Sequence, residues 1–281
     1  MQRVLVTGAG GFVGARILQQ WQGRFCLLRL PAGFLARAGE REVLAEVTAL
    51  APQVILHTAA LSDTGYCEAN PVQSYRANVL LPLWLARAAR QVGAALVCFS
   101  SDQVYAGVAQ PGPLPESLAL HPANVYGRHK LEAEQRVLDC LPEAVLLRAS
   151  WMYDLPGYGL PIRGNLPLNL LGAALRGQSL RFSPQEYRGV TYVRQAVALL
   201  EPVLALPGGV YNYGSENPLD MLQTARCFAQ AMGLQVPLAP LDRRRNLAMD
   251  CARLRQYGIC FDSTAQGIRR CLRDYGLAAA E

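Results

Sequence analysis

The sequence predicts an α/β fold built on a doubly wound parallel sheet, with a smaller substrate lobe in the C-terminal half. A short apolar run, Val4–Val6, leads into glycines and then into an amphipathic stretch, which is the order of strand, turn and helix. Strand-sized apolar runs then alternate with helical patterns up to residue 150. Of the 281 residues, 51% are hydrophobic and 17% are charged, which is ample for a packed core. Together these features indicate a sheet of the Rossmann type.

The glycine turn after the first strand is expected to bind a nucleotide. Val13, Ile17 and Trp21 recur four apart, so they share one face of the helix that follows. Glycines let the backbone approach a pyrophosphate, and the start of a helix offers it free N–H groups. The pattern T-G-x-x-G-x-x-G is also compatible with a plain tight turn. If the turn binds a cofactor, the contacts come from Gly8, Gly11, Phe12, Val13 and Gly14.

The end of the second strand bears on the choice of cofactor. Residues 25–28 form a strand-sized apolar run, and Arg29 follows it. An acidic residue at this place would bond the ribose hydroxyl of NAD, but the first acid after the run is Glu40. We therefore expect Arg29 to bind the extra phosphate of NADP(H), although NAD(H) stays possible. The alternative is that Arg29 is only a solvated residue at a strand end.

The rest of the first half supplies further strand ends. We expect a short link over 31–39, helices over 42–50, 75–91 and 124–138, and strands over 54–57, 95–99 and 145–147. Ligands bind beyond the carboxyl ends of parallel strands, where Gly8, Thr58, Ser101 and Ser150 should converge. His57, alone in its strand, is expected to be structural. Further expected cofactor contacts are Thr58, Ala59, Ala60 and Ser100.

The second half of the chain has a different residue pattern from the first. Residues 154–167 are rich in Gly and Pro and are expected to form a loop. Helices are expected over 169–176, 194–206 and 219–232, and strands over 189–193 and 210–213. We therefore divide the chain into an NAD(P)-binding domain, residues 1–150, and a mixed substrate-binding lobe, residues 151–281, with elements that return to the sheet.

A tyrosine and a lysine on the predicted helix 124–138 are candidate catalytic residues. Tyr126 and Lys130 are four apart and share one helix face. The ammonium should favour the phenolate and lower the tyrosine pKa, so that the pair can exchange a proton with a carbonyl or alcohol oxygen. Ser101 could bond the same oxygen, and Asn78 could hold a water beside the lysine. Both Tyr126 and Lys130 should also contact the cofactor. The alternative is an ordinary surface Tyr–Lys pair.

Composition and charge limit the kinds of molecule that the protein is expected to bind. The formal charge of +6 comes from scattered basic residues, with Arg243–Arg245 as the one run, so an anionic small ligand is favoured over nucleic acid. The longest apolar run, Val79–Ala86, is too short to cross a membrane. The eight cysteines form no C-x-x-C pair, which is typical of reduced thiols. We expect a cytoplasmic protein without signal peptide, and no acidic cluster suggests a metal site.

These motifs resemble those of the extended short-chain dehydrogenase/reductase superfamily, and within it the dTDP-4-dehydrorhamnose reductase family. The glycine turn, the strand-end serine and Y-x-x-x-K carry the resemblance, which extends over essentially the whole chain. Other segments resemble family motifs: residues 57–60 are similar to N-A-A, residues 100–105 to S-T-D-Y-V-F, residues 147–153 to L-R-T-S-W-V-Y, and residues 245–250 to R-P-x-N-x-x-L-D.

The resemblance implies NADPH-dependent reduction of the 4-keto group of a nucleotide-linked deoxysugar, as in dTDP-rhamnose biosynthesis. It places Ser101 at the catalytic threonine position, with Tyr126, Lys130 and Asn78 completing the catalytic set. The family pattern departs at Gln103, where it has Tyr, and at Gln195, where it has Asp. Arg148, Arg163 and Arg243–Arg245 are candidate pyrophosphate ligands. Expected substrate contacts are Asp102, Gln103, Trp151 and Arg245.

Two other functions stay open. An epimerase would use the same serine, tyrosine and lysine with tightly held NAD, which Arg29 disfavours. A non-enzymatic regulatory subunit is the other alternative, since the β subunit of methionine adenosyltransferase resembles the same family. In the 4,6-dehydratases of the superfamily Asp-Glu follows the strand-end threonine, and Gln103 after Asp102 argues against that reaction. The sequence does not identify the sugar or the nucleotide carrier, and it allows a homodimer without arguing for one.

Overall fold

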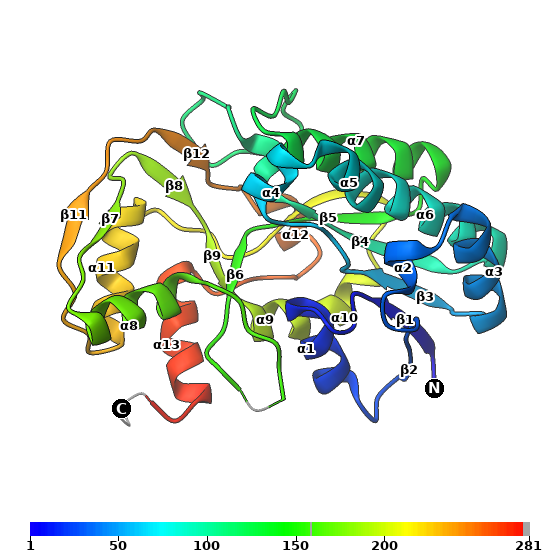
Figure 1. The fold of residues 1–281 in the computed structure, drawn as a ribbon, viewed down its shortest axis with the longest axis horizontal. Coiled ribbons are helices and arrows are strands. Elements are labelled where there is room, and N and C mark those ends of the chain that lie inside the picture. Colours follow the sequence, from blue (N-terminus) through cyan, green and yellow to red (C-terminus); the bar gives the residue numbers. More distant parts are fainter. Residues whose placement is uncertain (158, 278–281) are drawn as a thin grey trace.

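The computed structural model describes residues 1–157 and 159–277, and its main feature is a six-stranded parallel sheet (Figure 1). The strand order is β10-β5-β4-β3-β1-β2, and every neighbouring pair is parallel. This confirms the predicted fold class. The strands are β1 (Arg3–Thr7), β2 (Cys26–Leu28), β3 (Val54–His57), β4 (Ala95–Ser101), β5 (Val145–Ala149) and β10 (Gly209–Tyr213).

Helices cover both faces of this sheet because its strands are apolar on both sides. In β1, Val4 and Val6 face one core and Leu5 faces the other, as the two-residue period of a strand requires. The first core contains residues of α1 (Phe12–Trp21), α9 (Val193–Ala198) and α10 (Leu200–Val203). The second contains residues of α3 (Glu40–Leu50), α6 (Leu81–Val92) and α7 (Val125–Cys140). In Figure 1 these two groups lie below and above the strands.

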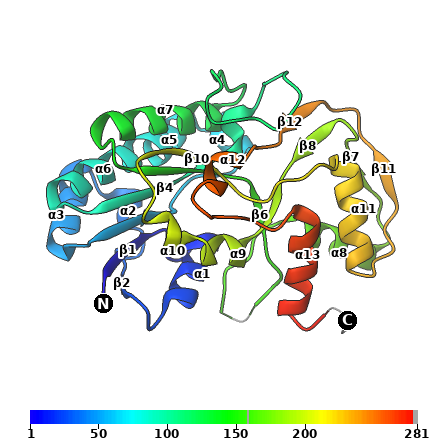
Figure 2. The same cartoon turned by 180° about the vertical axis from the view of Figure 1, so that it is seen from behind.

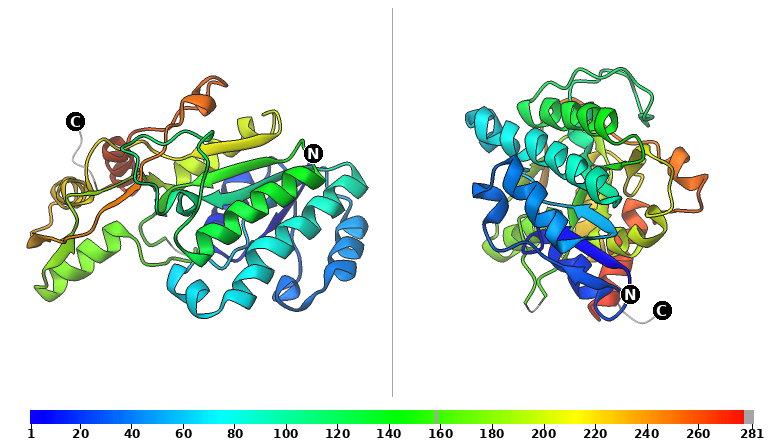
Figure 3. Two further views of the ribbon diagram at one scale, coloured as in Figure 1. Left: turned by 90° about the horizontal axis from the view of Figure 1, so that it is seen from above. Right: turned by 90° about the vertical axis from the view of Figure 1, so that its right-hand side faces the viewer.

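The smaller lobe lies at one end of the sheet, as the views from behind and from above show (Figures 2 and 3). Beside its helices, the described part of this lobe contains three two-stranded parallel sheets, β6 with β9, β7 with β11 and β8 with β12. A separate core packs around Tyr153, Tyr192, Phe228 and Ile268. The lobe contains β6 (Trp151–Tyr153), α8 (Leu166–Arg176), β7 (Leu180–Phe182), β8 (Glu186–Arg188), β9 (Val190–Tyr192), α11 (Met221–Ala231), β11 (Leu238–Pro240), β12 (Arg245–Leu247) and α13 (Thr264–Asp274), and α12 (Ala252–Arg255) packs against β10.

The predicted helix over 194–206 is wrong as a single element. It is divided into α9 and α10, and Pro202 lies in the second piece. Proline has no N–H to continue a helical ladder, which explains the break.

The helix predicted over 75–91 is also interrupted. It consists of α5 (Pro71–Tyr75), a π-helical turn η1 (Arg76–Leu80) and α6. Further short elements that were not predicted are α2 (Phe34–Arg37), α4 (Thr64–Ala69) and the 3-10 turn η2 (Asp102–Tyr105).

Two further expectations concern the chain as a whole. In the described part of the chain, no helix has the length and apolar character needed to cross a membrane. The eight cysteines are free thiols, four of them buried.

Candidate active site

The glycine turn between β1 and α1 is tightly packed. Gly8 has a φ of 71°, which a side chain disfavours, and a Cβ there would lie 2.7 Å from the backbone nitrogen of Ala59. A Cβ at Gly14 would collide with the carbonyl of Gly8. The Gly11 N–H donates to the same carbonyl at 2.8 Å, and α1 begins at the next residue. The turn therefore presents the N-terminus of α1 with no side chain in between, as a bound pyrophosphate requires.

A cavity of about 1030 Å³ opens beyond the carboxyl ends of the strands. It extends from the glycine turn to the smaller lobe, so the convergence of strand ends that the sequence predicts is present. The predicted site residues that line it are Gly8, Gly11, Phe12, Val13, Thr58, Ala59, Ala60, Ser100, Ser101, Asp102, Gln103, Tyr126, Lys130, Trp151 and Arg245.

Tyr126 and Lys130 lie buried on α7 at the wall of this cavity. The Lys130 ammonium donates to the Phe99 carbonyl at 2.8 Å and lies 5.8 Å from the centre of the Tyr126 ring. Burial raises the pKa of Tyr126 above its usual value, and contact with Ser101 opposes that rise. The expectation that Lys130 lowers the tyrosine pKa is therefore wrong, because desolvation is the larger effect. Tyr126 is a neutral phenol that can donate a proton.

The pKa of Lys130 is shifted in the opposite direction to that of Tyr126. Burial lowers its pKa to about 8, since a desolvated ammonium is less stable than a neutral amine.

Asn78 lies outside the cavity lining, and a water held between it and Lys130 stays a prediction. It is fully buried in the π-helical turn η1. Its amide nitrogen donates to the Leu61 carbonyl at 2.9 Å, and its amide oxygen accepts from the Leu61 N–H at 3.2 Å. Asn78 is thus a positioning residue, because it fixes the segment that follows β3. Thr58, Ala59 and Ala60 of this segment line the cavity.

Arg29 and Gly14 also lie outside the cavity lining. Gly14 packs against the Gly8 carbonyl, so only a glycine fits at this position. Arg29 is exposed directly after β2, the strand next to β1 at the edge of the sheet. Its role toward a ribose phosphate stays a prediction.

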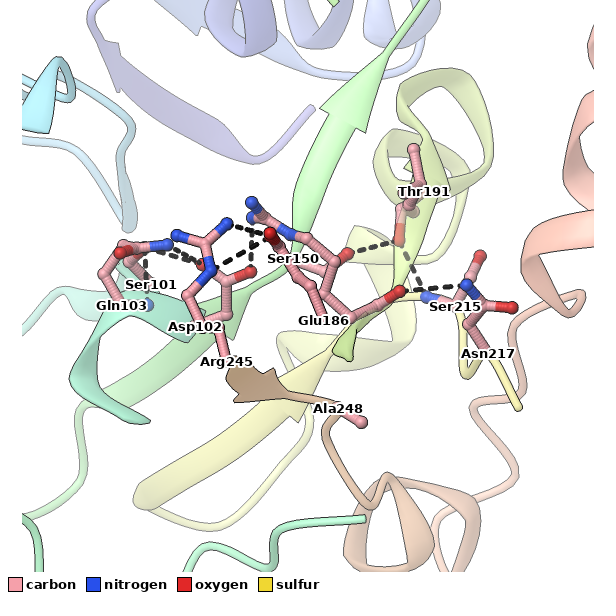
Figure 4. A network of polar contacts seen from close by, with 12 residues as sticks. Ser101, Asp102, Gln103, Ser150, Glu186, Thr191, Ser215, Asn217, Arg245 and Ala248 are labelled. Atoms are coloured by element: carbon pink, nitrogen blue, oxygen red, sulfur yellow. Dashed lines mark hydrogen bonds and ion pairs between the residues drawn. The ribbon is translucent and has the colours of Figure 1, made fainter. Parts of the chain in front are cut away.

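The side of the cavity next to the smaller lobe is formed by a polar network across the two lobes (Figure 4). Asp102 pairs with Arg188 of β8 at 2.6 Å and accepts from the Gln103 amide at 3.3 Å. The Arg188 guanidinium lies 5.2 Å from the centre of the Trp151 ring. Arg245 of β12 bonds Glu186 of β8 through its Nε at 3.0 Å. The sequence analysis missed Arg188 and Glu186, which lie just before the predicted strand 189–193 with no motif of their own.

Arg148 is not a phosphate ligand, and this corrects the sequence analysis. It forms a buried ion pair with Glu134 at 2.8 Å and donates to the Tyr105 hydroxyl at 2.8 Å. Glu134 also accepts a hydrogen bond from Ser100. The guanidinium therefore stabilises the sheet below the cavity and is not among the groups that line it.

His57 has a structural environment, as expected. Its Nδ1 lies 2.7 Å from the hydroxyl of Thr7, its register partner on β1, and the side chain is buried. Burial lowers its pKa to about 3, so the ring is neutral. Among residues 1–157 and 159–277, no group of three or more His, Cys, Asp or Glu side chains is placed to hold a metal ion.

The chain matches the protein family described as RmlD substrate binding domain over residues 1–274. Three relatives are informative. The spore coat polysaccharide biosynthesis protein SpsK of Bacillus subtilis is 25% identical over 85% of this chain and 82% of its own. The dTDP-4-dehydrorhamnose reductase of Aggregatibacter actinomycetemcomitans is 33% identical over 54% of this chain and 52% of its own. The methionine adenosyltransferase 2 subunit beta of Xenopus laevis is 26% identical over 92% of this chain and 83% of its own.

A solved structure gives the same result for the fold. The dTDP-4-dehydrorhamnose reductase of Bacillus anthracis in complex with NADP superimposes with a TM-score of 0.87 over 98% of this chain and 99% of its own, at 21% sequence identity. At this identity the likeness concerns the fold, whereas the family match concerns the sequence itself.

Proposed function

Since the chain belongs to the RmlD substrate binding domain family, whose extended short-chain dehydrogenase/reductase fold it shares, we propose that it reduces the 4-keto group of a nucleotide-linked deoxysugar with NADPH. One observation carries the proposal: Ser101 and the neutral phenol of Tyr126 line the same cavity as a glycine turn on one side and an arginine-rich wall on the other. Such a cavity can accommodate a dinucleotide and a large anionic substrate together.

The chain's own residues would perform the proton chemistry. NADPH, when bound, supplies the hydride that reaches the carbonyl carbon of the sugar. Tyr126 donates its proton to the carbonyl oxygen, which becomes a hydroxyl group. Ser101 orients that oxygen by a hydrogen bond. Lys130 holds α7 to β4 through the Phe99 carbonyl and places a positive charge beside the phenol when its amine is protonated.

The charge on the substrate lobe supports an anionic carrier on the sugar. Arg188, Arg243 and Arg245 all line the cavity from this side, and they pair with only two carboxylates, Asp102 and Glu186, so one positive charge stays in excess. Arginine is well suited to bidentate contacts with phosphate oxygens. Trp151 adds an aromatic surface against which a sugar ring can pack. A nucleoside diphosphate attached to the sugar would match these groups, whereas a simple ketone would leave them unused.

The proposal is tested with purified protein, NADPH and a panel of dTDP-linked 4-keto-6-deoxy sugars. We expect loss of NADPH absorbance together with formation of the reduced sugar, and loss of both in the Tyr126→Phe variant. Isomerisation without net oxidation of the cofactor would assign the protein to the epimerases instead. Tight NADPH binding without turnover of any sugar would contradict the reductase proposal.

A non-enzymatic regulatory subunit is the second candidate, for one reason. The alignment with the methionine adenosyltransferase 2 subunit beta covers 92% of this chain, whereas the alignment with the reductase covers 54%. The presence of Ser101, Tyr126 and Lys130 in one cavity favours the enzyme. The sugar panel separates the two, because a subunit of this kind would bind the cofactor without consuming it.

A further inference from the structure

We propose that Arg163 is a cofactor ligand that pairs with the pyrophosphate of the dinucleotide at the N-terminus of α1. This inference rests on the dinucleotide binding in the proposed function, but not on the reaction. Arg163 is among the candidate ligands for the substrate, but its contact with Phe12, the first residue of α1, favours the cofactor.

The first argument is where the side chain lies. The Arg163 guanidinium is 5.3 Å from the centre of the Phe12 ring, and Phe12 is the first residue of α1. Its Nη1 donates to the Ser62 hydroxyl at 3.0 Å. Ser62 follows the segment 58–60, which packs against Gly8. Arg163 thus spans the cavity between the two backbone segments that flank a bound pyrophosphate.

The second argument is the anchoring of the segment that carries Arg163, residues 159–165. Arg16 of α1 is fully buried and donates both to the Phe12 carbonyl at 2.7 Å and to the Pro161 carbonyl at 3.0 Å. Arg16 also pairs with Asp154 at 2.6 Å. Asn165 closes the segment by donating to the Asp154 carbonyl at 2.9 Å. One buried arginine therefore ties the segment to the first turn of the phosphate-binding helix.

The third argument is charge. Five basic residues line the cavity, and three of them are paired with carboxylates: Arg188 with Asp102, and Arg243 and Arg245 with Glu186. Lys130 is held by the Phe99 carbonyl. Arg163 has no carboxylate within ion-pair distance in the described part of the chain, and its guanidinium donates to the neutral Ser62 hydroxyl.

The neighbourhood of Arg163 makes this lack of a counter-ion significant. Asp63 lines the same end of the cavity, but its carboxylate caps α4 by accepting from the Tyr66 N–H at 2.7 Å. Arg163 is itself exposed, so the positive charge of its guanidinium is accessible to a ligand. Two phosphate charges at the adjacent helix N-terminus would compensate it.

The test measures cofactor affinity without substrate. NADPH and NADH are titrated separately against wild type, Arg163→Ala and Arg163→Lys by fluorescence or calorimetry. We expect Arg163→Ala to weaken both cofactors by the same factor, about tenfold or more, because both contain the pyrophosphate. Arg163→Lys should recover part of the loss. Arg226→Ala, which removes an exposed charge on α11, controls for net charge and should leave both affinities unchanged.

The other outcomes overturn the proposal. Weaker binding of NADPH alone would assign Arg163 to the ribose phosphate, and unchanged affinities for both cofactors would leave it no role in binding them. A higher KM for the nucleotide sugar at unchanged cofactor affinity would assign it to the substrate. A wild-type protein that binds neither dinucleotide also overturns it.

A protein that binds both dinucleotides but reduces no sugar contradicts only the proposed function. Equal thermal midpoints of wild type and Arg163→Ala exclude a folding defect.

Discussion

At the scale of single residues, Tyr126 is the group on which the proposed chemistry depends. Its phenol is neutral because burial raises its pKa, and it lines the cavity together with Ser101. We predict that Tyr126→Phe retains NADPH affinity but lowers kcat by about two to four decades, the usual contribution of a positioned proton donor. Steady-state kinetics beside a cofactor titration measure both quantities. Turnover near that of wild type would mean that another group supplies the proton.

Arg29 is the residue that decides the cofactor prediction. It is exposed immediately after β2, and no acidic residue precedes Glu40. We predict that NADPH binds more tightly than NADH, and that Arg29→Ala removes most of the difference without weakening NADH. Each tenfold preference corresponds to about 1.4 kcal/mol, which one arginine–phosphate contact can supply. Equal affinities in the wild type would contradict this.

His57 connects a single residue to the stability of the sheet. Burial lowers its pKa to about 3 from 6.5, so between these values the unfolded chain binds a proton at His57 that the folded chain does not. Its contribution to the unfolding free energy therefore falls as the pH falls from about 6.5 towards 3. We predict a shallower loss of stability over this range in His57→Asn than in wild type. Denaturant titrations at several pH values measure it, and parallel curves would exclude the effect.

At the scale of elements, the buried pair between Arg16 and Asp154 joins α1 to the chain that follows β6. Both side chains are fully buried, and Tyr275 also donates to Asp154 at 3.0 Å. Removing one partner leaves a buried charge uncompensated, so we predict that Asp154→Ala lowers the unfolding free energy by about 3 to 5 kcal/mol. Glu201→Ala breaks an exposed pair with Arg24 and should cost less than about 1 kcal/mol. Equal losses in the two variants would show that burial does not govern the pair.

At the scale of the whole molecule, the two halves of the chain share one core. β10 is the sixth strand of the sheet, and it pairs with β5. Residues of α9, α10 and β10 fill the same core as α1, among them Val193, Val197, Leu200, Val203, Tyr211 and Tyr213. We predict that a fragment of residues 1–150 does not unfold cooperatively, because it lacks this side of its core. A sharp thermal transition with native near-UV dichroism in the fragment would contradict this, and the full chain is the control.

Much of this molecule could be predicted from the sequence because the deciding interactions are local. The six sheet strands follow from mostly apolar runs of three to five residues, and the glycine turn follows from three glycines beside one strand. Tyr126 and Lys130 were recognisable because one helix turn separates them. Their chemistry was less predictable, since the pKa of Tyr126 depends on desolvation by chain that is distant in the sequence.

Tertiary structure alone decided which arginines are available to a ligand. Arg148 and Arg163 have the same side chain, but one is paired with Glu134 inside the molecule and the other bonds Ser62 across the cavity. Arg188 meets Asp102 although 86 positions separate them. No local pattern encodes such pairs, because a guanidinium gains its partner only when distant segments pack together. The sequence therefore determined the six strands of the sheet and the convergence of their ends, whereas packing determined the charge that each side chain presents to the cavity.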